Sequence, residues 1–151
     1  MFPNLFSKKP LPKKIPPHLE KIIKQLKKSK TKEQCLKKAY DILTKNYKGF
    51  KFNLFKRLSD LFVQDIANLS KRKGEHFCQH LDYIMRIVLV KSGFFKDEDI
   101  EQKITLFWYF SLHQYLRIKI NKNKYINIDI WSKRYGIRFG DYAHGFNVSP
   151  F

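Results

Sequence analysis

The apolar positions in the first 90 residues recur at the spacing of α-helices. A short amphipathic helix is predicted over residues 17–28, where apolar side chains stand three or four positions apart: Leu19, Ile22, Ile23 and Leu26. A second helix is predicted to begin after Thr31, which can cap its first turn with Gln34 as capping-box partner, and to end at Gly49. A third helix is predicted over residues 52–69.

A fourth helix is predicted to begin at Cys78 and to end at Ser92 and Gly93. Its inner side is apolar at helical spacing: Leu81, Ile84, Met85, Val88 and Leu89. A basic turn that ends at Gly74 leads into it. We therefore expect a buried central helix that carries a cysteine in its first turn.

After residue 100 the pattern changes to that of strands. Three runs are rich in β-branched and aromatic residues, and the second and third alternate between apolar and polar positions: 103–110, 114–120 and 124–130. Residues 121–124 are polar and predict the hairpin turn between the last two. Helices followed by an antiparallel sheet predict an α+β fold, with the central helix packed on the sheet. The segment 134–151 is left without an assignment.

The length of 151 residues favours a single domain over residues 18–151, preceded by an arm. That arm, residues 1–17, holds five of the six prolines and four lysines and is expected to have no helix. It is expected either to be disordered or to lie over the domain through Phe2, Leu5 and Phe6.

The composition is that of a globular protein, with 43% hydrophobic residues, which excludes an intrinsically disordered chain. The formal charge of +18 favours an acidic partner or nucleic acid, although lysines spread over helix faces also fit a solvated surface. No run approaches the ~20 apolar residues of a membrane span, and the N-terminus lacks a secretory signal pattern. Cys35 and Cys78 suggest no disulfide framework, and Cys35 is expected to be buried, so a reduced, cytoplasmic protein is predicted.

Cys78, His113 and Asp129 follow one another in the order of a nucleophile, a base and an orienting carboxylate. A cysteine is nucleophilic as thiolate, and a helix N-terminus and a neighbouring imidazolium both lower the pKa of a thiol. His113 stands at the start of one predicted strand, and Asp129 stands on the returning strand. The hairpin brings both residues to the same level of the sheet, or within a residue or two of it. Since paired strands lie ~4.8 Å apart, we expect a hydrogen bond between them.

This ordered trio resembles the transglutaminase-like superfamily, whose fold is papain-like. The family motifs resemble Gly-x-Cys, then His-x-Trp-x-x-Val, then Trp-x-x-x-Asp some fifteen residues on. The matching residues here are Cys78, the run from His113 through Tyr115 to Ile118, and Asp129, sixteen residues after the histidine. The resemblance covers residues 58–131. Gly74 stands four residues before the cysteine, Tyr115 replaces the family's Trp, and Ile-Trp follows the aspartate where Pro is common.

The resemblance implies a cysteine-dependent acyltransferase or hydrolase that forms a thioester on Cys78 with a peptide or protein amide. His113 would act as acid and base and Asp129 would orient it, with no metal or organic cofactor. The oxyanion hole would use the Cys78 N–H, and the second donor stays open, with Gln64 as one candidate. The alternative is a non-enzymatic basic binding module on the same fold, which contacts nucleic acid or an acidic protein. No RNP1 or Cys/His finger motif is present.

Further histidines and tryptophans lie near these positions in the sequence. His76 and His80 flank Cys78 and would suggest zinc, but in a regular helix the cysteine points away from both histidines. His144 is the second choice for the base, in a loop that either folds over the site or forms an ordered tail. Trp108 and Trp131 are expected in the core, where Trp131 would also shield the His–Asp pair from water.

Overall fold

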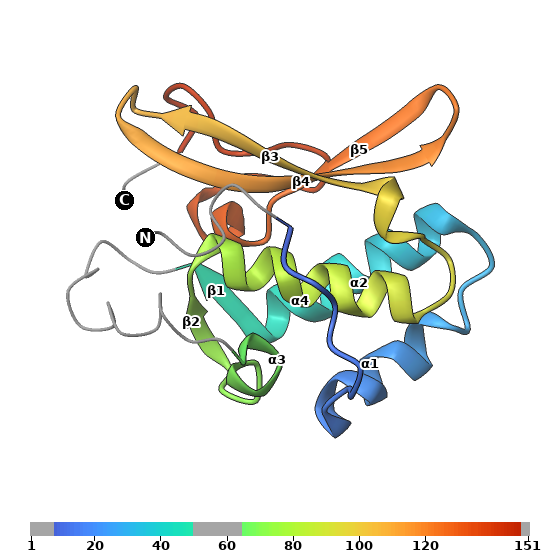
Figure 1. Ribbon diagram of the computed structural model, residues 1–151. Coiled ribbons are helices and arrows are strands. Elements are labelled where there is room, and N and C mark those ends of the chain that lie inside the picture. Colours follow the sequence, from blue (N-terminus) through green and yellow to red (C-terminus); the bar gives the residue numbers. More distant parts are fainter. Residues whose placement is uncertain (1–7, 50–64, 149–151) are drawn as a thin grey trace.

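The computed structural model describes residues 8–49 and 65–148, which form a helical layer against a three-stranded antiparallel sheet (Figure 1). The predicted α+β class is therefore confirmed. Helix α4 (Cys78–Lys91) contacts the sheet on one side and packs against α1 (Pro17–Leu26) and α2 (Lys32–Asn46) elsewhere. None of the helices in the described ranges is both long and apolar enough to cross a membrane.

Helices α1 and α2 form where the apolar spacing predicts them. The predicted stripe of α1 is buried, and Pro17 occupies its first turn, where a missing N–H costs nothing. Thr31 caps α2, since its hydroxyl accepts a hydrogen bond from the Gln34 N–H at 3.1 Å. The Gln34 side chain accepts from the Lys30 N–H at 2.6 Å, one residue earlier than a capping box requires.

The predicted end of the second helix was wrong by three residues. Helix α2 ends at Asn46, because Tyr47–Gly49 forms strand β1, which pairs in parallel with β2 (Gly74–His76). Of the predicted helix at 52–69, residues 52–64 lie outside the described residues, and the described part is the short helix α3 (Ile66–Leu69). Gln64, the candidate oxyanion donor, also lies outside them.

Helix α4 is the buried centre of the structure, as predicted, and residues 79–89 are buried along almost its whole length. It includes a charged side chain, Arg86, which is fully buried and forms a bidentate ion pair with Asp97 at 3.0–3.1 Å. The same guanidinium donates to the Lys9 carbonyl at 3.0 Å, and the Tyr83 hydroxyl donates to the Pro10 carbonyl at 2.7 Å. The described part of the N-terminal arm therefore lies along α4, whereas Phe2, Leu5 and Phe6 fall outside the described residues.

The sheet consists of β3 (Ile100–Phe107), β4 (Ser111–Asn121) and β5 (Lys124–Ile128), with β4 in the middle. The predicted β4–β5 hairpin is present, with its turn after Asn121. The first strand was predicted to reach residue 110 but ends at Phe107. Trp108 and Tyr109 adopt positive φ angles of 52° and 58° and turn the chain.

After β5 the chain forms the short helix η3 (Trp131–Tyr135). The segment that the sequence left unassigned, from residue 134 on, then crosses to the β3–β4 turn. The Trp108 N–H donates to the Gly145 carbonyl at 2.6 Å, and the Gly145 N–H donates to the Leu106 carbonyl at 3.1 Å. The indole of Trp108 also donates to the Val148 carbonyl at 3.3 Å. These bonds attach the end of the chain to the sheet.

Candidate active site

His113 and Asp129 form a buried hydrogen-bonded pair. The His113 Nε2 lies 2.7 Å from the Asp129 Oδ2, and the two residues are 3% and 1% exposed. His113 is the third residue of β4, and Asp129 directly follows β5, where Ile128 pairs with Leu116. This register places Asp129 next to Tyr115, two residues from His113, so the predicted hydrogen bond is present.

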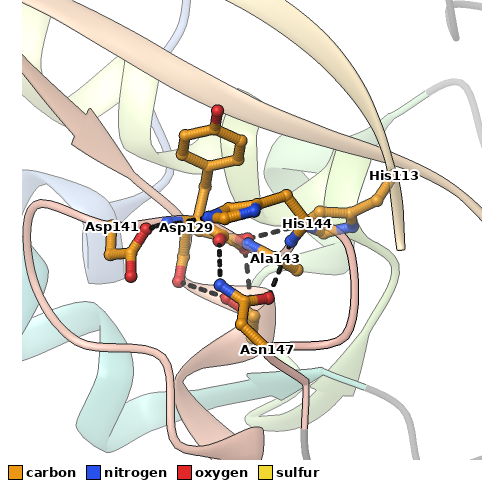
Figure 2. Close-up of polar contacts among 8 residues, drawn as sticks. His113, Asp129, Asp141, Ala143, His144 and Asn147 are labelled. Carbon is orange, nitrogen blue, oxygen red and sulfur yellow. Dashed lines mark hydrogen bonds and ion pairs between the residues drawn. The ribbon is translucent and has the colours of Figure 1, made fainter. Parts of the chain in front are cut away.

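Backbone donors hold the Asp129 carboxylate in place (Figure 2). Its Oδ2 accepts from the Ala143 N–H at 2.9 Å, and its Oδ1 accepts from the Ser132 N–H at 3.2 Å. Burial alone would raise the pKa of Asp129, but the charge of His113 and these hydrogen bonds hold it below its usual value. Asp129 is therefore an ionised, oriented acceptor for the imidazole.

The loop that supplies Ala143 is itself fixed. The Asn147 side chain donates to the Tyr142 carbonyl at 2.9 Å, and its Oδ1 accepts from the His144 N–H at 2.8 Å (Figure 2). Tyr142 stacks on Tyr115 with ring centroids 4.0 Å apart and planes 8° apart. Tyr115 thus supports the loop that supplies Ala143.

Aromatic rings enclose the imidazole of His113. Its centroid lies 4.9 Å from the Trp131 ring and 5.8 Å from the Phe107 ring. Trp131 therefore covers the pair, as the sequence predicted. Burial lowers the pKa of His113, but the charges and hydrogen bonds of Asp129 and Cys78 outweigh it and raise that pKa well above its usual value. Because Nε2 is bound to Asp129, Nδ1 is the ring nitrogen left for a thiol.

Cys78 is the first residue of α4, which has 14 residues and begins after Phe77, a residue with no capping side chain. Its thiol is free and partly exposed. It is close enough to His113 to raise the pKa of the imidazole. The structure thus brings the three predicted residues into one cluster, with the thiol at the positive end of a helix dipole.

Sequence inspection missed Asp82, which lies one helical turn after Cys78 and is 2% exposed. Burial, followed by the charges of Cys78 and Asp129, raises the pKa of Asp82 well above its usual value, so the fold favours the neutral form of this carboxyl. Its Oδ2 has no hydrogen-bond partner within the described ranges. The signal in the sequence was an acidic residue beside Leu81 on an apolar helix.

Asp82→Asn should stabilise the protein at pH 7. A carboxyl whose folded pKa is raised is ionised in the unfolded chain but not in the folded one, so stability falls as pH rises above the unfolded value of about 3.9. Each pKa unit corresponds to about 1.4 kcal/mol, and we expect a gain of at least about 1 kcal/mol in the free energy of unfolding.

Urea denaturation at pH 7 and at pH 3.5 measures this gain, which should vanish at the lower pH. The control is Asp41→Asn, which removes a carboxylate that is 48% exposed and pairs with Lys37. A variant less stable than the native protein at pH 7 would mean that Asp82 is ionised and paired in the fold.

The other histidines lie outside the Cys78, His113 and Asp129 cluster. The His144 ring is 49% exposed and faces Asp141, with Nε2 3.6 Å from Oδ1. His76 Nε2 lies 2.6 Å from the Arg72 carbonyl oxygen, and its ring contacts that of His80. No group of three or more His, Cys, Asp or Glu side chains among the described residues is arranged to hold a metal ion.

The second cysteine is buried, whereas Cys78 is partly exposed. Cys35 is fully buried in α2, as predicted, with its Sγ 3.6 Å from the Ser92 hydroxyl. Burial raises the pKa of Cys35, which the hydrogen bonds of Ser92 and Ser29 only partly offset. At neutral pH, Cys35 is therefore an inert thiol.

Comparison of the chain with protein-family models, with curated proteins and with solved structures finds no match. The assignment of a role to Cys78, His113 and Asp129 thus depends on the geometry of the site.

Proposed function

We propose that this protein is a transglutaminase-like thiol enzyme, which hydrolyses amides or transfers their acyl groups through a thioester on Cys78. One observation supports this most strongly: a buried His–Asp pair lies beside a cysteine at the N-terminus of a long helix. A buried histidine without a partner would lose its proton, because burial disfavours the charged ring. Asp129 instead stabilises the imidazolium of His113 beside Cys78.

In the proposed reaction, the Cys78 thiolate attacks the carbonyl carbon of an amide, and the S–C bond forms as the carbonyl oxygen becomes an oxyanion. The backbone N–H of Cys78 is placed at the helix start to donate to that oxygen. His113 gives its Nδ1 proton to the leaving amine as the C–N bond breaks, which leaves a thioester.

In the second half of the proposed reaction, water or a primary amine attacks the thioester carbonyl. His113 takes a proton from the attacking group, and Cys78 leaves as thiolate, so the starting imidazolium–thiolate pair is restored. Water gives hydrolysis and an amine gives acyl transfer. Asp129 stays ionised throughout, because backbone N–H groups and the imidazole hold its charge.

Intact-protein mass spectrometry tests the proposal directly. The protein is incubated with a p-nitrophenyl ester and with a library of glutamine-containing peptides, and the Cys78→Ala variant serves as control. We expect an acyl adduct on Cys78 that disappears on adding a primary amine, with the acyl group recovered on the amine or on water. Equal ester turnover by native protein and Cys78→Ala, with no adduct on either, would refute the proposed chemistry.

A further inference from the structure

A basic groove lies between α1, the end of α2 and residues 70–73, which precede β2. Its volume is about 670 Å³, and Lys21, Lys71 and Lys73 line it. We refer to it as the lysine groove. Cys78, His113 and Asp129 do not line it, so it is separate from the candidate active site.

Among the described residues, the lining of the lysine groove carries cations and no carboxylate. No Asp or Glu lines it, and within the described ranges none of its three lysines forms an ion pair. A second groove of about 490 Å³ shares Pro17 and Lys71 with it and adds Lys14. The acid there, Asp65, accepts a hydrogen bond from the Asn68 N–H at 3.0 Å, and the hydrogen bonds of Asn68 together with the charges of Lys9 and Lys71 lower its pKa, so it offsets part of the charge of Lys71. The surface thus offers several adjacent cations, whose mutual repulsion a bound anion would relieve.

The floor of the lysine groove is held by hydrogen bonds. The His18 Nε2 lies 2.5 Å from the Ser70 hydroxyl, and the Tyr47 hydroxyl donates to the Ser70 carbonyl at 2.6 Å. Burial and the charge of Lys71 lower the pKa of His18, so its ring is neutral at pH 7 and the cationic charge stays with the lysines. Ile22 and Ile42 add an apolar wall.

We infer that the lysine groove binds a nucleotide, with its phosphate on Lys21, Lys71 and Lys73 and its base against the apolar wall. Three observations support this: three lysines in the lining, an adjoining apolar surface, and a volume within the range of about 300–1,000 Å³ typical of small-molecule sites. The shared chemistry is a phosphate ester beside a planar ring. A free mononucleotide and one unit of a single-stranded nucleic acid both present it.

Fluorescence polarisation with a labelled 15-nucleotide oligothymidylate tests this inference, using UMP and AMP as unlabelled competitors. The test variant replaces Lys21, Lys71 and Lys73 by Ala. The matched control replaces Lys91, Lys122 and Lys133, which are exposed, lie outside the groove and form no ion pair with a described residue. Both variants remove three charges from the formal +18, so they differ only in where the charge is lost.

If the groove binds single-stranded nucleic acid, the groove variant should have an affinity for the oligonucleotide about tenfold lower than that of the native protein. The affinity of the control variant should change by less than about threefold. The slope of log affinity against log salt should fall by about 2, since each single-strand phosphate contact contributes about 0.7. Displacement of the oligonucleotide by mononucleotides at comparable phosphate concentration would assign the site to the free nucleotide. Equal weakening in both variants, or no binding of the labelled oligonucleotide in 50 mM salt, would overturn the inference. Alkylation of Cys78 should be unchanged in the groove variant, which separates this outcome from the test of the proposed enzyme.

Discussion

Replacing His113 by Ala should slow alkylation of Cys78 by iodoacetamide at pH 6 by at least about tenfold. A free thiol with a pKa of about 8.5 is only about 0.3% thiolate at pH 6. In the native protein the raised pKa of His113 keeps a cation beside the sulfur at this pH, and the start of α4 adds its dipole. Removal of the imidazole takes that cation away from the sulfur, so alkylation should slow.

Two further variants keep this result interpretable. His113→Ala leaves the Asp129 carboxylate buried without its partner, which is strongly destabilising, so His113→Gln is measured beside it. The glutamine amide can donate to Asp129 but cannot carry a proton to or from sulfur. His144→Ala, at an exposed histidine, should leave the rate unchanged. A rate at pH 6 that is the same in native protein and folded His113→Gln would show that the imidazole does not act on Cys78.

Gly49→Ala should lower the free energy of unfolding by about 2–3 kcal/mol, the cost of overpacking a filled site. A Cβ on Gly49 would meet the carbonyl oxygen of Trp131 and lie 2.7 Å from its Cγ and Cδ1. The carbonyl belongs to the backbone of η3, so β1 and η3 must separate to make room. Because the Trp131 ring lies on His113, that separation also disturbs the His113–Asp129 pair.

Urea denaturation at pH 7 gives the stability change, and Cys78 alkylation at pH 6 gives the effect on the site. Lys48→Ala, at the exposed neighbouring position of β1, is the control and should fall within about 0.5 kcal/mol of native. A Gly49→Ala protein of native stability would show that β1 and η3 are not packed as closely as described.

The local pattern of apolar and polar residues was enough to predict those helices and strands whose buried face is set by the spacing of their apolar residues. The stripe of α1, the Thr31 cap of α2, the start of α4 at Cys78 and the β4–β5 hairpin were each found in the structure. The β3–β4 turn was not predictable in this way. Two of its three residues, Trp108 and Tyr109, have positive φ angles but lack the Asn-Gly signature of such turns. Hydrogen bonds to Gly145 and Val148, far along the chain, hold that turn.

The same distinction applies to the candidate site. The His113–Asp129 contact was predictable because a short hairpin fixes which residues of its two strands lie opposite each other. The Ala143 and Ser132 N–H groups that orient Asp129 have no side-chain signature, so a sequence does not reveal them. Asp82 can be recognised in the sequence as an acidic residue within an apolar helix. Its interactions with Asp129 and His113 cannot, because those residues lie more than 30 positions later in the chain.

The pH profile of Cys78 alkylation in the native protein tests the thiol site most directly. Peptide mapping assigns the label, and Cys35→Ala confirms that the buried cysteine does not contribute. We predict substantial reactivity that persists below pH 7 in the native protein, as the proposed imidazolium–thiolate pair requires, and the loss of that reactivity in His113→Gln. Reactivity that rises only near pH 8.5, the value of a free thiol, in both proteins would contradict the proposed role of Cys78, His113 and Asp129.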